Sequence, residues 1–286
     1  MKKTFLLIFL LMSVMGKSIE ISAPPTPSSL PFFIEEDDYN VEIFKSHDKA
    51  NAKFVSGKSQ VLVTGFNAAF AFRKQNIPIK VISVSFGDLS YFISDGFDLF
   101  ASGKNFTVSL PFKNSPLDTQ FKTILSVDNE LNKRCKIVYN PFQASRQLLK
   151  RKKIDLTVLP EPLASKAVIV DNLKRVSSIN QLWHKFFQTE NGVPKTAVIV
   201  RTDILSEKEI SEIKQKLKKH AEELKKNPKM TIKLLQKNLK LTEKEAATVA
   251  ENISINYLFD EELVKNASEY LKSIKRENDF DKDLFK

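Results

Sequence analysis

Short runs of β-branched residues alternate with amphipathic segments along most of this chain, and no other feature constrains the fold as strongly. The expected strands are Ile19–Ser22, Val41–Phe44, Gln60–Thr64, Ile79–Ser83, Phe106–Leu110, Lys136–Tyr139, Leu156–Leu159 and Ala197–Val200. The helices expected between them are Ser29–Glu36, His47–Ser56, Asn67–Gln75, Pro116–Asn129, Gln143–Lys150 and Leu163–Val170. Strands that alternate with helices in this way are typical of an α/β fold.

Beyond Leu205 the sequence predicts a helical tail. Capping boxes begin two of its helices, one made by Ser206 with Glu209 and one by Thr242 with Glu245. Pro228 suits the first position of a third helix. The many Lys and Glu residues of this tail favour a solvated helix face, and a membrane or an acidic partner is the alternative.

The first 18 residues have the pattern of a secretory signal peptide. Lys2 and Lys3 precede an apolar run from Phe5 to Met15, which is shorter than the about 20 residues needed to span a bilayer. Cleavage after Gly16 or Ser18 fits the small-residue rule, and an uncleaved membrane anchor is the alternative. No Cys stands directly after the run, where a lipoprotein would carry one, so we expect an exported periplasmic protein that is not a lipoprotein.

The composition argues against several classes of protein. The net charge is +11, yet 38 of the 45 basic residues are Lys, which weighs against a nucleic-acid binder because base and phosphate contacts favour Arg. With only 7 Gly, a glycine-rich nucleotide site is not expected, and the single Cys135 excludes an internal disulfide.

No catalytic or metal-binding motif is present in the sequence. His47, His184 and His220 share no metal-ligand spacing with one another or with Cys135, and we expect His220 at the surface of a basic helix. A nucleophile elbow and a P-loop are also missing. We therefore expect a protein without catalytic residues, metal or cofactor.

Charge is distributed unevenly and suggests two lobes. Residues 19–102 carry a net charge of −3, residues 103–201 carry +10 and residues 202–286 carry +1. A positive middle segment would attract an anionic ligand or an acidic partner. A solvated, Lys-rich surface is the alternative explanation.

Four segments carry a resemblance to one family. They are Ala23–Leu30, Val61–Ala69, Asn114–Asp118 and Lys153–Ser165, and the pair Leu182-Trp183 follows them. Their order resembles the solute-binding proteins of ABC importers, of the nitrate, sulfonate, taurine and thiamine-precursor type. The resemblance extends over nearly the whole chain after the signal peptide, and the segment Leu159-Pro160-Glu161-Pro162-Leu163-Ala164-Ser165 is its most specific part.

The resemblance implies a type II periplasmic-binding-protein fold, in which two α/β lobes enclose a cleft and a helical tail follows. Lobe one would comprise residues 19–102 and 196–286, and lobe two residues 103–195. The protein would be a monomer that binds a small organic, anionic or zwitterionic solute. It would deliver this solute to an ABC permease in the inner membrane.

The resemblance also places the ligand at strand-to-helix junctions, where exposed N–H groups can bind an anion. The expected ligand-binding residues are Thr26, Ser28, Thr64, Gly65, Asn67, Phe86, Asp88, Asn114, Ser115, Asp118, Pro160 and Glu161. For the Ser, Thr, Asn and Asp residues the alternative role is ordinary helix capping or turn formation. Phe86 could instead pack in the core, and Glu161 could form a salt bridge between the lobes instead of binding a cationic group.

Other functions remain open at this point. Enzymes of thiamine-precursor and menaquinone synthesis share the implied fold, but the former rely on a cysteine-rich motif that one Cys cannot supply. The latter have no reason to be exported. A sensor or adhesin built on the same binding lobes is a third possibility. Gly residues of the family's cleft loops are replaced here by Pro25, Phe112 and Lys113, so the sequence does not identify the ligand.

Overall fold

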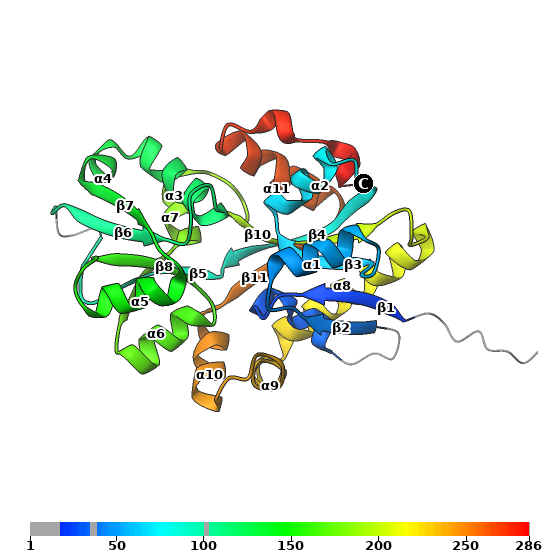
Figure 1. Ribbon diagram of the computed structural model, residues 1–286, viewed down its shortest axis with the longest axis horizontal. Helices are drawn as coiled ribbons and strands as arrows, with labels where there is room; N and C mark the ends of the chain where they lie inside the picture. Colours follow the sequence, from blue (N-terminus) through cyan, green and yellow to red (C-terminus); the bar gives the residue numbers. More distant parts are fainter. Residues whose placement is uncertain (1–17, 35–38, 100–102, 286) are drawn as a thin grey trace, which may run out of the picture.

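The structure is a computed structural model that describes residues 18–34, 39–99 and 103–285. Nearly all of the expected signal peptide, residues 1–17, lies outside the described residues. Two β-sheets, each covered by helices on both faces, lie side by side along the long axis of the molecule (Figure 1). The expected α/β fold with two lobes is therefore confirmed.

The first sheet has six strands in the order β11-β4-β10-β3-β1-β2. They are β1 (Ile19–Ala23), β2 (Tyr39–Ile43), β3 (Val61–Gly65), β4 (Ile79–Asp88), β10 (Pro194–Arg201) and β11 (Ser254–Leu258). Strands β1, β2 and β3 are parallel, whereas β10 runs antiparallel to both β3 and β4. The side chains of β3 alternate between two apolar cores, as the period of a strand requires, with Leu62 in one core and Val61 and Val63 in the other.

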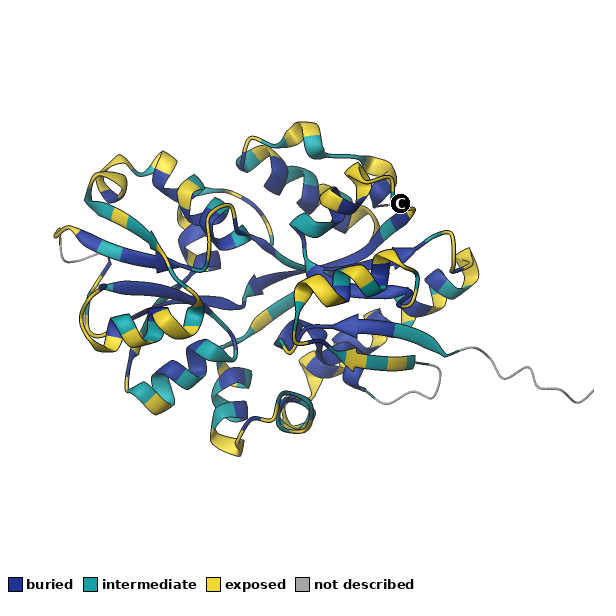
Figure 2. Cartoon of the chain, in the orientation of Figure 1, coloured by how far each residue is buried: buried dark blue, intermediate teal, exposed yellow. Residues whose placement is uncertain are grey.

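Helices on each face of this sheet bury those side chains. On one face are α1 (His47–Val55), α2 (Asn67–Lys74) and α11 (Asp260–Ser273), which share a core with Leu62. On the other face α8 (Glu207–Lys226) presents Ile213 and Leu217 to the strands. Figure 2 shows the dark blue strands between helices whose outer faces are exposed.

The second sheet has five strands in the order β7-β6-β8-β5-β9. They are β5 (Ser90–Ser94), β6 (Phe106–Leu110), β7 (Cys135–Tyr139), β8 (Leu156–Pro160) and β9 (Lys174–Ser178). The helices around it are α3 (Pro116–Val127), α4 (Asn129–Arg134), α5 (Phe142–Lys150), α6 (Leu163–Asp171) and α7 (Ile179–Phe186). The residues of α3, α4 and α7 join the core on one face, and those of α5 and α6 join the core on the other.

The chain changes sheets at Leu89, which separates β4 from β5, and returns to the first sheet with β10. Residues 90–94 therefore pair in the second sheet, although the break in charge near residue 103 had suggested that they belong to lobe one. The two crossings bring Leu89 and Pro194 to the region between the sheets.

The helical tail is confirmed in part. The capping boxes of Ser206 with Glu209 and of Thr242 with Glu245 begin α8 and α10 (Glu243–Asn252). Pro228 is the first residue of α9 (Pro228–Leu239). The prediction that everything beyond Leu205 is helical is wrong at β11, because this segment pairs with residues 84–88 of β4.

His220 is buried, with an exposed fraction of 3%, so the prediction of a surface position is wrong. Its spacing explains this, because His220 follows Leu217 by three residues and precedes Leu224 by four, which places it on the buried face of α8. Its Nδ1 lies 2.9 Å from the carbonyl oxygen of Pro31, in the short 3₁₀ helix Pro27–Phe33. That 3₁₀ helix stands where the sequence predicted an α-helix over Ser29–Glu36.

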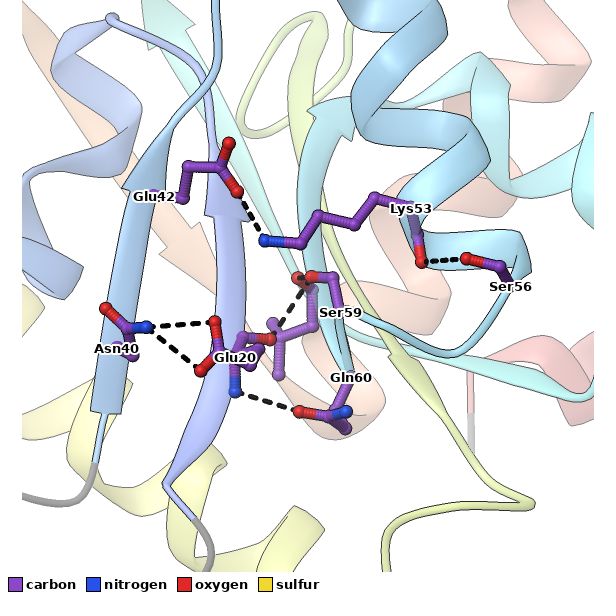
Figure 3. A network of polar contacts seen from close by, with 8 residues as sticks. Glu20, Asn40, Glu42, Lys53, Ser56, Ser59 and Gln60 are labelled. Atoms are coloured by element: carbon purple, nitrogen blue, oxygen red, sulfur yellow. Dashed lines mark hydrogen bonds and ion pairs between the residues drawn. The ribbon is translucent and has the colours of Figure 1, made fainter.

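Polar contacts fix the outer edge of the first sheet (Figure 3). The Asn40 amide on β2 donates to both carboxylate oxygens of Glu20 on β1, at 2.9 and 3.0 Å. The backbone N–H of Glu20 donates to Oε1 of Gln60 at 2.8 Å, and Lys53 of α1 pairs with Glu42. These contacts hold β1, β2 and α1 together, and with them the loop after β1. Among the described residues, no helix combines the length and the apolarity needed to cross a bilayer.

Candidate ligand-binding cleft

A cavity of about 430 Å³ lies between the two sheets and is lined by residues of both. The ends of β3 and β8 contribute Thr64, Gly65 and Pro160, and the two crossings contribute Leu89 and Pro194. In open α/β sheets the ligand site lies outside the carboxyl ends of strands, so this is the position expected from topology. The volume suits a small organic molecule.

The structure brings eight of the twelve expected ligand-binding residues to this cavity. They are Thr26, Ser28, Thr64, Gly65, Asn67, Ser115, Pro160 and Glu161. They come from four strand-to-helix junctions that are far apart in the sequence. Their role in binding stays a prediction.

Three hydroxyl groups form a chain along one wall. The Oγ of Ser28 lies 3.0 Å from Oγ1 of Thr26 and 2.8 Å from Oγ1 of Thr196. Thr196 belongs to β10, so this chain connects the loop after β1 to the strand that returns from the second sheet. Hydroxyl groups both donate and accept, and they can reorient toward a polar ligand.

Helices begin at the cavity on both sides. His47 and Asn67 are the first residues of α1 and α2, Ser115 caps α3, and Phe142 is the first residue of α5. The N-terminus of a helix carries a partial positive charge and free N–H groups. Four such ends around one cavity favour an anion over a cation.

Two expected residues, Asn114 and Asp118, do not line the cavity but organise the loop that does. The carboxylate of Asp118 accepts from the backbone N–H of Asn114 at 2.7 Å and from the hydroxyl of Tyr139 at 2.9 Å. It also pairs with Lys122 at 3.0 Å, and its own N–H donates to Ser115 Oγ at 3.1 Å. Asn114 adopts the left-handed conformation (φ 63°) in this turn.

Phe86 and Asp88 also lie outside the cavity lining. Phe86 is completely buried in the apolar core. Its position therefore matches core packing, the alternative stated in the sequence analysis for this residue. Asp88, at the end of β4, accepts a hydrogen bond from the hydroxyl of Ser178.

Glu161 lies at the cavity, and its carboxylate is paired with a basic side chain. It is 1% exposed and forms an ion pair with Arg175 of β9, and its Oε2 accepts from the N–H of Ser165 at 3.1 Å. The Arg175 guanidinium stacks over the ring of Tyr91 with 4.9 Å to the centroid. Glu161 directly follows β8 and Arg175 lies in β9, both strands of the second sheet, so Glu161 forms a salt bridge within one half of the molecule and not between the lobes.

Sequence reasoning missed several residues of the cavity, above all Asn51, Gln120, Lys195 and Thr196. Each of the first three has a buried side-chain atom without a partner among the described residues: Oδ1 of Asn51, Oε1 of Gln120 and Nζ of Lys195. The signal that could have located Lys195 and Thr196 is the expected lobe boundary between residues 195 and 196. A segment that crosses between two lobes must border the cleft.

The remaining lining is mostly apolar. Leu89, Leu117, Phe142 and Ala68 contribute to it, and so does Phe112, which is 61% exposed. His47 also lines the cavity, and partial burial lowers its pKa although the neighbouring Asp48 acts in the opposite direction. No three His, Cys, Asp or Glu residues of the described chain come together as metal ligands would.

Several solved structures share the fold that surrounds this cavity. Neither a protein-family model nor a curated relative matches the sequence. Among solved structures, the ligand-binding component of an ABC-type import system from Staphylococcus aureus, solved with zinc bound, is similar over 92% of both chains, with a TM-score of 0.70 and 13% identity. An ABC transporter protein from Parabacteroides distasonis covers 91% of this chain and 95% of its own, with a TM-score of 0.68 and 20% identity.

The periplasmic aliphatic sulphonate binding protein from Escherichia coli is similar over 92% of this chain and 91% of its own, with a TM-score of 0.68 and 10% identity. The chain has the fold of ABC-import solute-binding proteins. At these identities the comparison establishes the architecture, and the expected type II periplasmic-binding-protein fold is confirmed. In proteins of this fold, a cavity between the two halves is the natural place for a small ligand.

Proposed function

We propose that this protein is the solute-binding component of an ABC importer and carries no catalytic activity of its own. The observation that carries the proposal is the cavity between the sheets, at which four helices from both halves begin. A ligand that contacts both halves would stabilise a closed arrangement, and a permease can recognise that arrangement. The similar structures named above support transport in preference to catalysis.

The ligand proposed for this cavity is a small organic solute with an anionic or zwitterionic head. Helix N-termini favour negative charge, and the buried Glu161 does not oppose it because Arg175 neutralises the carboxylate. We further propose that the protein acts as a monomer in the periplasm after removal of the signal peptide. It would deliver the solute to a permease in the inner membrane.

The test is to identify what the cavity holds. Protein purified under native conditions is denatured, and the released small molecules are identified by mass spectrometry. In parallel, thermal unfolding is measured with sulfonates, aromatic acids, nitrate and thiamine precursors, because a compound bound only by the folded state raises the midpoint. Turnover of any of these compounds would contradict the proposal and favour an enzyme.

A substitution at Gly65 tests whether the ligand occupies this cavity. It lines the cavity, and a Cβ built on it would meet no atom within 4 Å. Its φ is outside the positive range, so a side chain introduces no backbone strain there. We expect Gly65→Phe to fold with a far-ultraviolet spectrum like that of the wild type and to lose the thermal response. A retained response would place the ligand elsewhere.

A further inference from the structure

Among the described residues Lys195 is the only Lys or Arg that lines the cavity, and its position follows from an irregularity in β10. Pro194 pairs with Phe86 and Thr196 pairs with Ser85, so two adjacent residues of β4 face three residues of β10 and Lys195 is the extra one. Such a bulge redirects a side chain and is frequent beside functional sites. Here it occurs where the chain returns from the second sheet to the first.

The amine of Lys195 is buried and has no partner among the described residues. Neither of the two acidic groups near it forms an ion pair with it. Asp88, at the end of the neighbouring β4, accepts from Ser178 and forms no ion pair with Lys195 within the described chain, and Glu161 is paired with Arg175. The other titratable group at the cavity is His47 of α1, which is not acidic. An unpaired buried amine is costly, so the cavity lacks a counter-charge that a ligand can supply.

Two side-chain amides of the cavity lining, those of Gln120 and Asn51, also have a buried oxygen without a hydrogen-bond partner among the described residues. The Nε2 of Gln120 on α3 donates to the carbonyl oxygen of Pro194, the residue before Lys195, at 3.2 Å. The Oε1 of Gln120 has no hydrogen-bond partner among the described residues. Oδ1 of Asn51, from α1 in the other half, is also buried without a partner. A buried polar atom without a hydrogen bond costs about 1–3 kcal/mol. The three residues line one cavity, and each has an unmatched buried atom, one donor and two acceptors, which favours a ligand with polar groups there.

The remaining lining limits what else the ligand contains. Leu89, Leu117, Phe112 and Phe142 surround the polar groups with apolar surface. A hydrated inorganic ion would leave this surface without a partner, whereas an aliphatic or aromatic body would cover it.

We propose that Lys195 binds the acid group of an organic anion with an apolar body, such as a carboxylate or a sulfonate, and that the amine takes up a proton as the anion binds. This inference rests on the proposed capture of a solute in the same cavity. The proton comes from solvent and stays on Nζ, and no covalent bond changes. Oδ1 of Asn51 and Oε1 of Gln120 are acceptors, so they do not bind the acid group itself, and they can accept from a hydroxyl or N–H group elsewhere on the ligand.

The lowered pKa of the Lys195 amine is consistent with this arrangement. Burial lowers the pKa of its amine to about 7, and Asp88 counteracts the effect only in part. Without ligand the amine is thus largely neutral above pH 7 and largely charged below it. A bound anion raises that pKa, so the affinity for the anion should fall up to about tenfold for each pH unit above 7.

The experiment measures the binding of charge-matched probes by calorimetry and thermal shift at pH 6, 7, 8 and 9. The anions are hexanesulfonate, octanoate and phenylacetate, the neutral counterparts are hexanamide and phenylacetamide, and the cations are hexylamine and phenethylamine. Proton uptake is obtained at pH 8 by repeating the calorimetry in buffers of different ionisation enthalpy. The proteins are the wild type, Lys195→Met and Lys153→Met.

Lys153→Met is the matched control because Lys153 is exposed and lies outside the cavity, so it removes the same charge from the surface. We expect an anion to bind the wild type and Lys153→Met at pH 6, with uptake of about one proton at pH 8. We expect Lys195→Met to bind it at least tenfold more weakly and without proton uptake. Lys195→Met should fold, since it removes an unpaired charge from the interior and keeps the length of the side chain.

The other outcomes overturn the inference in distinguishable ways. Anion binding that is equal in Lys195→Met, or independent of pH, contradicts the role of Lys195 and leaves the proposed solute binding intact. Binding of only the neutral or cationic probes contradicts the anionic head group and again leaves solute binding intact. If no probe binds the wild type at any pH, both the inference and the proposed function lose their support.

Discussion

Among single residues, Lys195 and Glu161 show how differently two buried charges can be accommodated in one cleft. Glu161 has a guanidinium partner and a backbone donor, whereas Lys195 has neither a carboxylate nor a carbonyl partner among the described residues. Removal of one partner of a buried ion pair leaves the other charge uncompensated, whereas removal of an unpaired buried charge relieves its desolvation cost. These two residues therefore predict opposite effects on stability.

Replacement of Lys195 by Met should stabilise the ligand-free protein. In the unfolded chain the Lys pKa is 10.5, and burial lowers it to about 7 in the folded state. Between these values the unfolded state binds more protons, so the stability of the wild type rises with pH in this interval. We expect the variant to have the higher melting temperature at pH 7 and the difference to shrink as the pH approaches 10. Thermal unfolding of both proteins at several pH values measures this, and a constant difference would contradict it.

Replacement of Glu161 by Gln should destabilise the protein, because it leaves the guanidinium of Arg175 without its carboxylate. The side chain of Glu161 is 0% exposed and that of Arg175 16%, so little solvent compensates the loss. Breaking one partner of a buried pair costs about 3–5 kcal/mol. Chemical denaturation measures the loss, and the double variant Glu161→Gln with Arg175→Met should recover part of it. A single variant as stable as the wild type would show that the pair is not maintained in solution.

Among the elements, the ends of strands and the first turns of helices contribute most of the cavity lining, and short-range polar contacts fix the turns between them. The loop before α3 depends on Asp118, which binds the backbone of Asn114, the side chain of Lys122 and the hydroxyl of Tyr139. An acidic residue in the first turn also complements the helix dipole. Asp118 thus positions Ser115 at the cavity without lining the cavity itself.

Replacement of Asp118 by Ala should cost about 2–3 kcal/mol, because several hydrogen bonds of a buried carboxylate are lost together. Asp128→Ala is the matched control, since Asp128 caps the next helix α4 through one bond to Leu131 N at 2.9 Å and should cost about 1 kcal/mol. Denaturation midpoints give both values. Equal costs would show that the contacts of Asp118 contribute no more than an ordinary cap.

In the whole molecule, the two halves touch outside the cleft where α6 meets α10. The hydroxyl of Tyr91, on β5 of the second sheet, donates to the carbonyl oxygen of Asn252 at the end of α10. Lys166 of α6 lies 4.0 Å from Glu245 of α10. Because α10 packs with α9 and with Leu30 of the first half, these contacts link the two halves on one side.

Replacement of Tyr91 by Phe should loosen this link. It removes a buried hydroxyl donor, at a cost of about 1 kcal/mol, and we expect a larger radius of gyration in small-angle X-ray scattering of the ligand-free protein. Tyr139→Phe removes a comparable bond to Asp118 within the second half and should lower the melting temperature without a change in the radius. The same radius in wild type and Tyr91→Phe would show that this contact does not set the separation of the halves.

The sequence by itself determined the alternation of strands and helices, the helix caps at Ser206 and Thr242, and the strand-to-helix loops that reach the cavity. These features depend on neighbours within a few residues, so local patterns report them. The strand β11, the burial of His220 and the change of sheet at Leu89 depend on partners that are distant in the sequence. Only the tertiary structure decided them.

The same distinction applies to the cavity. Thr64, Gly65 and Ser115 were predictable because they end a strand or cap a helix. Lys195 and Gln120 were not, because their importance comes from missing partners, and a missing partner is visible only when every neighbour has been placed. Whether a buried polar atom is satisfied is a property of the packed molecule, and no local sequence pattern contains it.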